Sequence, residues 1–432
     1  MNTSLVLLFA LGGTAVLILN AFRDGVSLSQ RSLPALYAAG GDESGTCASR
    51  RGASGGHWEK DVVFAQDQQY HPMVPNRMGK RSNDAHKPDP SDPENTKYRA
   101  PTTYFWRDSP ETEEECGRLI PLHRAEFCRV AERLELDRIL FVGDSLTYGM
   151  SYALRAQVGI KAKIPNKILV DGVEILQDDH WNVTHVCRSG RKVIIEEHRS
   201  DHLNDELGFP AEKRRLPVLR HWIDNYLDFS GKTLLVVNTG AHFPARPQLD
   251  YRSVMDWFFD DLLSEKFDRP DDIVIMRTTP PGHPDCTTAV RPHASEEEFL
   301  ASFRPENIPI KKNRLRTSQY RWDTFDDMDA YMKEKVAQHK SRREIHLGPG
   351  PGPAVHLLDV VPLTRLRPDG HVSGPDNLDP LGKPEFDCLH YALPGPIDWW
   401  NNLMFANLAD LPPANAAPAT SADGLPAAPP QT

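Results

Sequence analysis

The most constraining feature of this sequence is a short, mainly apolar run, residues 138–143, that leads directly into Asp144 and Ser145. An apolar run of this length, ended by glycine and aspartate, is typical of a strand buried on both faces of a parallel sheet. Open α/β sheets place their active sites at the carboxyl ends of such strands. Ser145 is therefore predicted to lie at a functional edge of the sheet, at the start of a helix that runs to about residue 157.

Other apolar runs repeat this pattern, so that strands alternate with helices along the chain. The strongest further strand candidates are 234–237, 273–276 and 355–360, and weaker ones are 167–170, 183–187 and 192–196. Helical spacing of apolar residues predicts helices over 213–227, 251–265, 323–342 and 396–409, and over 111–135 with a break at Pro121. This alternation indicates an α/β fold with a mainly parallel sheet. No internal repeat is visible, which argues against a solenoid or propeller.

The amino-terminal segment Leu5–Ala21 is nearly all apolar and carries no charge. A segment of about 17 residues just spans the apolar core of a bilayer. Residues 1–4 carry no basic side chain, and Leu19-Asn20-Ala21 is a poor cleavage site for a signal peptide. Residues 1–23 are therefore predicted to be an uncleaved transmembrane signal anchor, with a cleaved signal peptide as the alternative.

The remaining chain divides into three parts by composition. Residues 24–101 are rich in glycine, serine and proline and are predicted to be a flexible stalk, with an ordered patch between Trp58 and Tyr70. Residues 102–410 carry the strand and helix pattern and are predicted to be the catalytic body. Residues 411–432 hold six prolines and seven alanines and are predicted to be a disordered tail.

The charge balance and the histidine spacing exclude some classes of function. The net charge of −10 argues against non-specific binding to nucleic acid or to an anionic membrane surface, since both favour a basic protein. The 17 histidines include no HExxH motif and no paired metal-ligand spacing, so no metal site is predicted. Asn182-Val183-Thr184 is a glycosylation sequon and favours a lumenal body.

The six cysteines contain no CxxC pair, which argues against a zinc ribbon. In a lumenal compartment they are candidates for disulfides, and buried free thiols are the alternative. Six cysteines allow about 15 connectivities, and the sequence does not choose among them. A pair between Cys116 and Cys128 would make a local link ahead of the strand that carries Ser145.

The candidate chemistry is nucleophilic catalysis by Ser145. A serine hydroxyl needs a base to remove its proton, and His390 is the best candidate because Asp387 precedes it by three residues. A carboxylate at that spacing can bind Nδ1 of the ring, which leaves Nε2 to face the serine. His242 and His283 also follow strands, but neither has a carboxylate three residues before it. The order Ser…Asp…His is one of the orders found in convergent triads.

An acyl-transfer site also needs hydrogen-bond donors for the developing oxyanion. The backbone N–H of Ser145 can be one donor, and the side-chain amide of Asn238, at the end of a predicted strand, can be a second. Gly190 is a candidate for a third. The alternative for Asn238 is a turn or helix-cap residue. Gly143 and Asp144 support the nucleophile by forming the turn.

These motifs resemble the PC-esterase group of GDSL/SGNH-like proteins. That group includes the plant trichome-birefringence-like polysaccharide O-acetyltransferases and the fungal capsule O-acetylation proteins. The matching blocks span about 102–409 and are residues 141–146, 238–240, 277–280, 358–371 and 387–401. Tyr391 and Ala392 replace the family's Trp-Cys, so its disulfide at that place is not carried over. The middle region of the plant proteins is not recognisable, so their substrate is not carried over either.

The resemblance implies an SGNH-like three-layer α/β/α sandwich with Ser145 as nucleophile and a triad completed by Asp387 and His390. It implies a single-pass type II membrane protein of the Golgi or secretory pathway with a lumenal catalytic domain; a secreted protein is the alternative. It implies no bound cofactor and a double displacement, from acetyl-CoA or another acyl carrier to a glycan hydroxyl. The alternatives are an ester hydrolase with the same triad and an inactive glycan-binding protein.

Overall fold

The computed structural model describes residues 46–53, 55–60, 104–160, 167–170, 173–176, 180–203, 222–243, 250–303, 322–345, 352–373 and 387–413. The chain divides into two units, residues 1–39 and 40–432, and all described residues belong to the second. The predicted anchor, much of the predicted stalk and the tail from residue 414 lie outside the described residues. Within the described ranges, no helix is long and apolar enough to cross a membrane.

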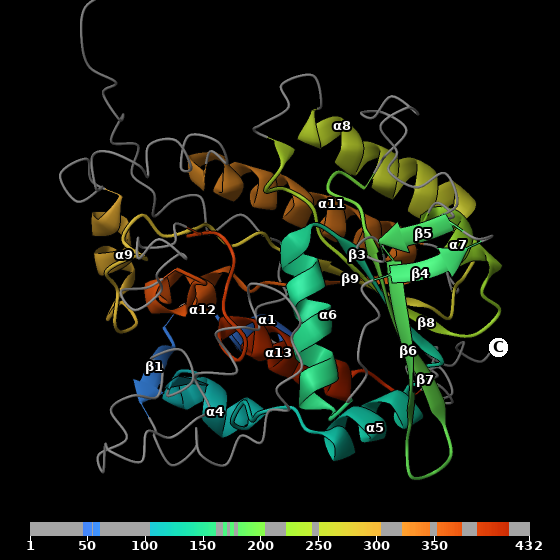
Figure 1. The fold of residues 1–432 in the computed structure, drawn as a ribbon, viewed down its shortest axis with the longest axis horizontal. Helices are drawn as coiled ribbons and strands as arrows, with labels where there is room; N and C mark the ends of the chain where they lie inside the picture. The colour runs from blue at the N-terminus through green and yellow to red at the C-terminus, as the bar shows by residue number, and fades with distance from the viewer. Residues whose placement is uncertain are drawn as a thin grey trace, which may run out of the picture. The chain divides into compact units, whose positions relative to one another are not determined.

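A six-stranded sheet forms the centre of the fold (Figure 1). Its strands lie in the order β10-β9-β8-β3-β7-β6. Their bounds are β3 Arg138–Gly143, β6 His180–Val186, β7 Lys192–Arg199, β8 Thr233–Val237, β9 Ile273–Arg277 and β10 Ala354–Leu358. All neighbours are parallel except the edge strand β6, which pairs antiparallel with β7. The prediction of an α/β fold with a mainly parallel sheet is confirmed.

Helices cover both faces of this sheet, because alternate residues of each strand point to opposite sides. Ile139 and Phe141 of β3 belong to a core shared with α5 Arg124–Arg133, α6 Ser145–Gln157 and α13 Pro396–Asp410. Leu140 and Val142 belong to a second core with α7 Trp222–Asp228, α8 Tyr251–Asp256, the π-helix η5 Trp257–Lys266 and α11 Phe325–Ile345. Short helices complete the main body: α4 Pro110–Cys116, α9 Glu296–Ser302, η6 Trp322–Thr324, α12 Val361–Arg365 and η7 Pro368–Gly370.

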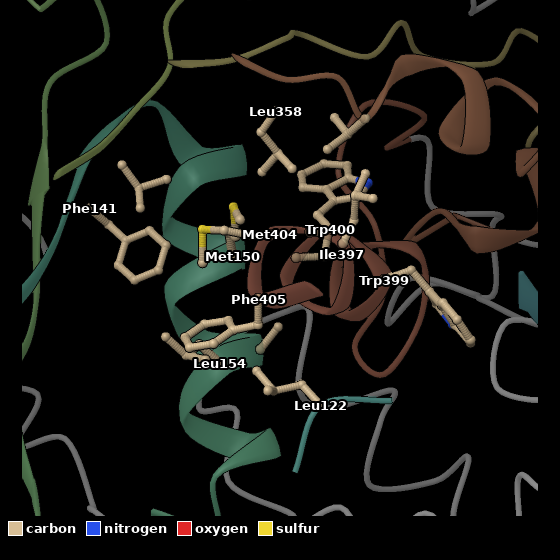
Figure 2. Close-up of a cluster of buried hydrophobic side chains, with 14 of the residues drawn as sticks. Leu122, Phe141, Met150, Leu154, Leu358, Ile397, Trp399, Trp400, Met404 and Phe405 are labelled. Carbon is tan, nitrogen blue, oxygen red and sulfur yellow. The ribbon is translucent and has the colours of Figure 1, made fainter. Parts of the chain in front are cut away.

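Helix α6, which begins at Ser145, packs along α13 at the other end of the chain. Figure 2 shows Met150 and Leu154 of α6 beside Met404 and Phe405 of α13, and all four side chains are buried. Polar contacts add to this packing: Asn401 Nδ2 donates to the Met150 carbonyl at 3.0 Å, and Gln157 Nε2 donates to Asn402 Oδ1 at 2.8 Å. The helix that begins at Ser145 is thereby fixed to the segment that follows His390.

An amino-terminal strap, residues 46–60 apart from Ser54, packs on the main body. It comprises α1 Cys47–Arg50 and β1 His57–Lys60, and β1 pairs antiparallel with β2 Tyr104–Arg107. Trp58 lies in the main core, donates from Nε1 to the Leu363 carbonyl at 2.8 Å and meets Trp399 edge-on at 5.7 Å between ring centroids. The strap precedes the predicted body at residues 102–410 and shares its core, because Trp58 packs against Trp106 and Trp399 and donates to the Leu363 carbonyl.

Three disulfides link the described cysteines: Cys47–Cys116, Cys128–Cys187 and Cys286–Cys388. The local pair Cys116–Cys128, one of the connectivities that the sequence left open, does not form. Cys116 ends α4 and meets the strap, whereas Cys128 on α5 meets the end of β6. The prediction that the cysteines form disulfides is confirmed, while their pairing depends on contacts that the sequence does not reveal.

Other elements agree with the predicted pattern except in detail. The predicted helix over 111–135 is split into α4 and α5 around Pro121, and the helix over 251–265 continues from α8 into η5. A further two-stranded sheet joins β4 Lys167–Val170 to β5 Val173–Leu176. Strand β7 runs to Arg199 rather than residue 196, because Glu196 and Glu197 are buried against Arg138 and Arg155.

Candidate active site

The turn after β3 presents Ser145 at the first position of α6. Asp144 caps this helix: its Oδ1 accepts the N–H of Leu146 at 2.9 Å and of Thr147 at 3.4 Å. Gly143 has φ +157°, and a Cβ there would lie 2.4 Å from the Asn238 carbonyl oxygen. The turn therefore needs a glycine, and the close approach sets the loop after β8 directly against the nucleophile turn.

The three predicted triad side chains lie together. His390 Nε2 lies 2.6 Å from Ser145 Oγ, and His390 Nδ1 lies 2.9 Å from each carboxylate oxygen of Asp387. Asp387 Oδ1 also accepts the backbone N–H of His390 at 3.1 Å, which makes the three-residue spacing a tight turn. The side chain of His390 is 22% exposed and that of Asp387 is 23% exposed, so the site is accessible from solvent.

The electrostatics of the pair suit a base and its orienting acid. Burial acts to lower the pKa of His390, but the hydrogen bond and charge of Asp387, with the charge of Asp144, outweigh it and raise that pKa above its ordinary value. Burial acts to raise the pKa of Asp387, but His390 outweighs it and holds that pKa well below the usual range. Asp387 therefore stays ionised, and a proton received from Ser145 is stabilised on His390.

The side chain of Asn238 is engaged elsewhere. Its Nδ2 donates to the Arg277 carbonyl at 2.8 Å and to Thr279 Oγ1 at 2.9 Å, which uses both amide hydrogens. The alternative interpretation, a structural residue at a turn, fits these contacts better than the expected oxyanion donor. The Ser145 N–H remains a candidate donor, because Asp144 engages the next two N–H groups of the turn and not this one.

Gly190 lies at the wrong edge of the sheet for an oxyanion donor. It sits in the exposed hairpin between β6 and β7, where its N–H donates to the Cys187 carbonyl at 3.0 Å. Because β7 runs parallel to β3, the start of β7 lies beside the start of β3, and Ser145 follows the opposite end. The expectation for Gly190 is wrong because a hairpin reverses the chain before the parallel strand begins.

Sequence reasoning missed a charged cluster on the loops that flank Ser145. Arg199 pairs with Gly143 across the β3–β7 ladder, and its Nε lies 3.0 Å from Asp201 Oδ1. His242, on the loop after β8, places its Nε2 3.8 Å from the same carboxylate oxygen. The charge of Arg199 acts to lower the pKa of His390. The polar residues after the predicted strands 192–196 and 234–237 could have indicated this cluster. The first of these strands was predicted to end at residue 196, however, so Arg199 was not placed at the end of a strand.

The rival histidines and the cysteines have other roles in the fold. His242 contacts Asp201, whereas His283 is fully buried and contacts His371. Cys128, His185 and Cys187 lie close enough together to hold a metal ion, but the two sulfurs are joined in a disulfide. A disulfide sulfur is not the thiolate that a metal binds.

Asn182 of the predicted sequon is exposed on the edge strand β6. Its position in the ladder is opposite Glu196 of β7. An exposed side chain on an edge strand leaves room for an attached glycan, so the position is sterically suited to the modification that the sequence predicts.

Comparison with known proteins gives one family and several plant relatives. Residues 128–407 match the PC-esterase family, described as the GDSL/SGNH-like acyl-esterase family found in Pmr5 and Cas1p. Protein trichome birefringence-like 26 of Arabidopsis thaliana is 29% identical over 160 residues, which cover 36% of this chain and 31% of the relative. Xyloglucan O-acetyltransferase 1 of the same plant is 46% identical over 59 residues, 12% of this chain and 14% of the relative. Xyloglucan O-acetyltransferase 2 is 32% identical over 96 residues, 22% of this chain and 23% of the relative. In each case the match spans under a third of the relative.

Proposed function

The chain belongs to the PC-esterase family of GDSL/SGNH-like acyl-esterases, and from this premise we propose that it is an O-acyltransferase acting on glycan hydroxyls through an acyl-enzyme at Ser145. The observation that carries the proposal is the continuous contact from Ser145 Oγ through the His390 ring to the Asp387 carboxylate. The placement of helices on both faces of the sheet also supports an SGNH-like three-layer sandwich.

In the first half-reaction, Ser145 Oγ attacks the carbonyl carbon of an acyl donor while its proton moves to His390 Nε2. The negative charge that develops on the carbonyl oxygen would be met by the N–H of Ser145 at the start of α6, where the helix dipole also favours an anion. When the tetrahedral intermediate collapses, the bond to the donor's leaving group breaks. The leaving group takes the proton from His390, and Ser145 carries the acyl group as an ester.

In the second half-reaction, a hydroxyl of the acceptor glycan gives its proton to His390 and attacks the acyl-serine. The ester bond to Ser145 breaks, Oγ recovers the proton from His390, and the acyl group leaves on the acceptor. The proposed group is acetyl and the acceptor a polysaccharide, since relatives of this chain are named xyloglucan O-acetyltransferases. Acetyl-CoA or another acetyl carrier would be the co-substrate, with no resident cofactor.

Ester hydrolysis is the second candidate function, and the exposure of the triad favours it. His390 is 22% exposed at its side chain, so water has a path to the acyl-enzyme. Transfer and hydrolysis share the first half-reaction and differ only in whether a sugar hydroxyl or water attacks. An inactive glycan-binding protein is the third candidate, and the intact hydrogen-bonded triad speaks against it.

Acetyl transfer to a glycan is the decisive test between these candidates. The full-length chain, incubated with an acetyl donor and a panel of neutral and acidic oligosaccharides, is expected to add one acetyl mass to an accepting glycan and to release less free acetate as acceptor is added. Both effects follow because acceptor and water compete for one acyl-enzyme. Acetate release that no glycan reduces, with no acetylated product, would leave the hydrolase as the function.

We also propose a lumenal location in the secretory pathway, with the membrane reached through residues 1–23. Its support is the set of three disulfides, which suit an oxidising compartment, and the exposed sequon at Asn182. The protein made in its own cells is expected to gain gel mobility on treatment with an endoglycosidase, and Asn182→Gln is expected to remove that shift. Unchanged mobility in the unmodified protein would contradict modification at Asn182.

A further inference from the structure

Two buried histidines that the proposed mechanism does not use lie directly behind the base. His371 Nδ1 lies 3.1 Å from the backbone carbonyl oxygen of His390, and His371 Nε2 lies 2.6 Å from His283 Nδ1. At the far end, His283 Nε2 lies 2.8 Å from the carbonyl oxygen of Arg365. Both rings are almost fully buried, and His371 stacks on Tyr391 at 4.2 Å between ring centroids. The chain of contacts therefore ends on the backbone of the residue whose ring faces Ser145.

The hydrogen-bond roles in this chain follow from what the end groups can do. A carbonyl oxygen only accepts, so the contact to the His390 carbonyl requires a proton on His371 Nδ1. His371 Nε2 then accepts the proton of His283 Nδ1. A third proton, on His283 Nε2, is needed for the contact to the Arg365 carbonyl. A neutral pair of rings has two protons, so only two of the three contacts can be hydrogen bonds. The pair makes both the bond to His390 and the bond between the rings when His283 is in its Nδ1–H tautomer, and the contact to the Arg365 carbonyl is then not a hydrogen bond.

The groups around the two rings favour the neutral pair. Burial lowers the pKa of His371 to about 3, with Arg367 acting in the same direction and Asp387 against it. Burial also lowers the pKa of His283, helped by the charges of His371, His293 and Arg367. The hydroxyl of Tyr391, the ring stacked on His371, donates to the Pro281 carbonyl at 3.1 Å and adds no charge.

Two backbone segments hold the Asp387–His390 turn, and the histidine pair connects them. On one side, Val372 N donates to the His390 carbonyl at 2.9 Å, and residues 371 and 391 form an antiparallel bridge. On the other side, Cys286 is bonded to Cys388, and His283 N donates to the Cys388 carbonyl at 3.2 Å. A Cβ on Gly282 would lie 2.3 Å from that carbonyl oxygen, so the two segments are in close contact.

We propose that His371 is a positioning residue for His390: its Nδ1–H holds the His390 carbonyl, and His283 fixes the required tautomer of His371. The rotation of the His390 backbone decides where its ring points, and the ring must meet Ser145 at Nε2 and Asp387 at Nδ1 together. A shift of the reacting groups by about 1 Å can cost on the order of 10²-fold in rate. The inference rests on the proposed role of His390 as base.

Three substitutions at residue 371 separate the two contacts of the ring. In His371→Asn, the amide reaches the position of Nδ1 and can still donate to the His390 carbonyl. In His371→Gln, the longer amide reaches the position of Nε2 and contacts His283 but not that carbonyl. His371→Phe removes both contacts and keeps a ring that can stack on Tyr391. The Asn and Gln variants are therefore a matched pair, equal in polarity and different only in which contact they keep.

Steady-state ester hydrolysis by the full-length chain is the main measurement. His371→Phe and His371→Gln are expected to lower kcat about 10- to 100-fold with KM little changed, and His371→Asn is expected to stay within about threefold of the unmodified chain. The pKa seen in the pH profile of kcat/KM is expected to fall in the Phe and Gln variants, because a loosened turn weakens the contact of His390 with Asp387. Thermal unfolding is measured on each variant.

A second measurement does not depend on turnover. In a Ser145→Ala background, the pKa of His390 is followed by NMR of labelled histidine, with His390→Gln identifying its signal, and is expected to fall with Phe and Gln but not with Asn at residue 371. If Asn lowers kcat as much as Phe, or if no variant moves kcat or this pKa, the positioning role is refuted. If the unmodified chain is no faster than Ser145→Ala, the proposed function fails, while the NMR series still decides the positioning role.

Discussion

Ser145→Ala is expected to abolish ester hydrolysis, with kcat lowered on the order of 10³-fold or more, as in other triad enzymes. The reason is that, among the described residues, Ser145 provides the hydroxyl that contacts the proposed base: its Oγ lies 2.6 Å from His390 Nε2. A chromogenic acetate ester reports the rate, and the yield of acyl-enzyme after rapid acid quench reports the intermediate by mass. Thermal unfolding is expected to be nearly unchanged because Ser145 is partly exposed at a helix start.

The matched control is Ser189→Ala in the hairpin at the opposite edge of the sheet. Ser189 is exposed, and its hydroxyl donates to Glu132 and accepts the N–H of Arg191, so its loss changes contacts only within this exposed hairpin and with Glu132. Its kcat and KM are expected to equal those of the unmodified chain. Full activity in Ser145→Ala, or an acyl group found on another residue, would contradict the proposal that Ser145 is the nucleophile.

Asp387→Asn is expected to lower kcat about 10⁴-fold, the loss found for the same change in a convergent triad. The amide cannot stabilise the charged ring, and it favours the tautomer of His390 that carries its proton toward Ser145. Because only neutral His390 accepts a proton, kcat/KM of the unmodified chain falls as pH falls through the raised pKa of His390. Without Asp387 burial dominates and that pKa drops, so the acid limb of the residual activity is expected to move to lower pH.

Asp268→Asn, on the exposed loop after η5, is the matched control for this change of charge and is expected to alter neither the rate nor the pH profile. The profile distinguishes a catalytic role from a folding defect, because a fraction of unfolded protein lowers kcat without moving the acid limb. An unshifted limb together with a small loss of rate would show that Asp387 does not govern His390.

The sequence predicted the parts of the site that depend on local spacing. Residues 138–145 form a strand, a glycine turn and a helix start, and each step follows from residue type at consecutive positions. The turn from Asp387 to His390 is equally local, since a carboxylate three residues before a histidine reaches both its backbone N–H and its ring. Asp387 lies 242 positions after Ser145. The resemblance of residues 387–401 to the family's closing block, and not the spacing, led to the prediction that this turn lies near Ser145.

The errors in the predicted oxyanion site come from contacts that no local pattern encodes. Asn238 directly follows β8 as expected, but the carbonyl of Arg277, the last residue of β9, and the side chain of Thr279 after β9 occupy its amide. Gly190 was assigned to a strand-end loop without knowledge that β6 runs antiparallel to β7. A sequence shows where a strand ends, but the direction of its neighbour decides which edge of the sheet that end occupies.

The sequence predicted an ordered patch from Trp58 onward but not the contacts of the strap, for a related reason. Residues 46–60 lack apolar periodicity, and their position is fixed by Cys116, Leu363 and Trp399, which lie up to several hundred positions away. Trp58 was the one visible signal, since a large aromatic residue in a polar stretch needs a partner. The disulfides follow the same rule: each pairs cysteines 59 to 102 positions apart, beyond the reach of any local pattern.

The contacts of the strap bear on the order in which parts of the structure can form during synthesis. A ribosome releases Trp58 long before Trp399 and the rest of α13, and Asp387 and His390 emerge just before α13. Until then the indole can meet Trp106 but not Leu363 or Trp399, so part of its apolar surface stays exposed, and such surface makes unfinished chains prone to aggregate. Emergence of residues 387–410 completes the contacts of Trp58, supplies the packing surface of α6 and brings the histidine that meets Ser145. Ser145 is thus synthesised well before His390. A chain that still lacks His390 cannot become acylated at Ser145 by the proposed route.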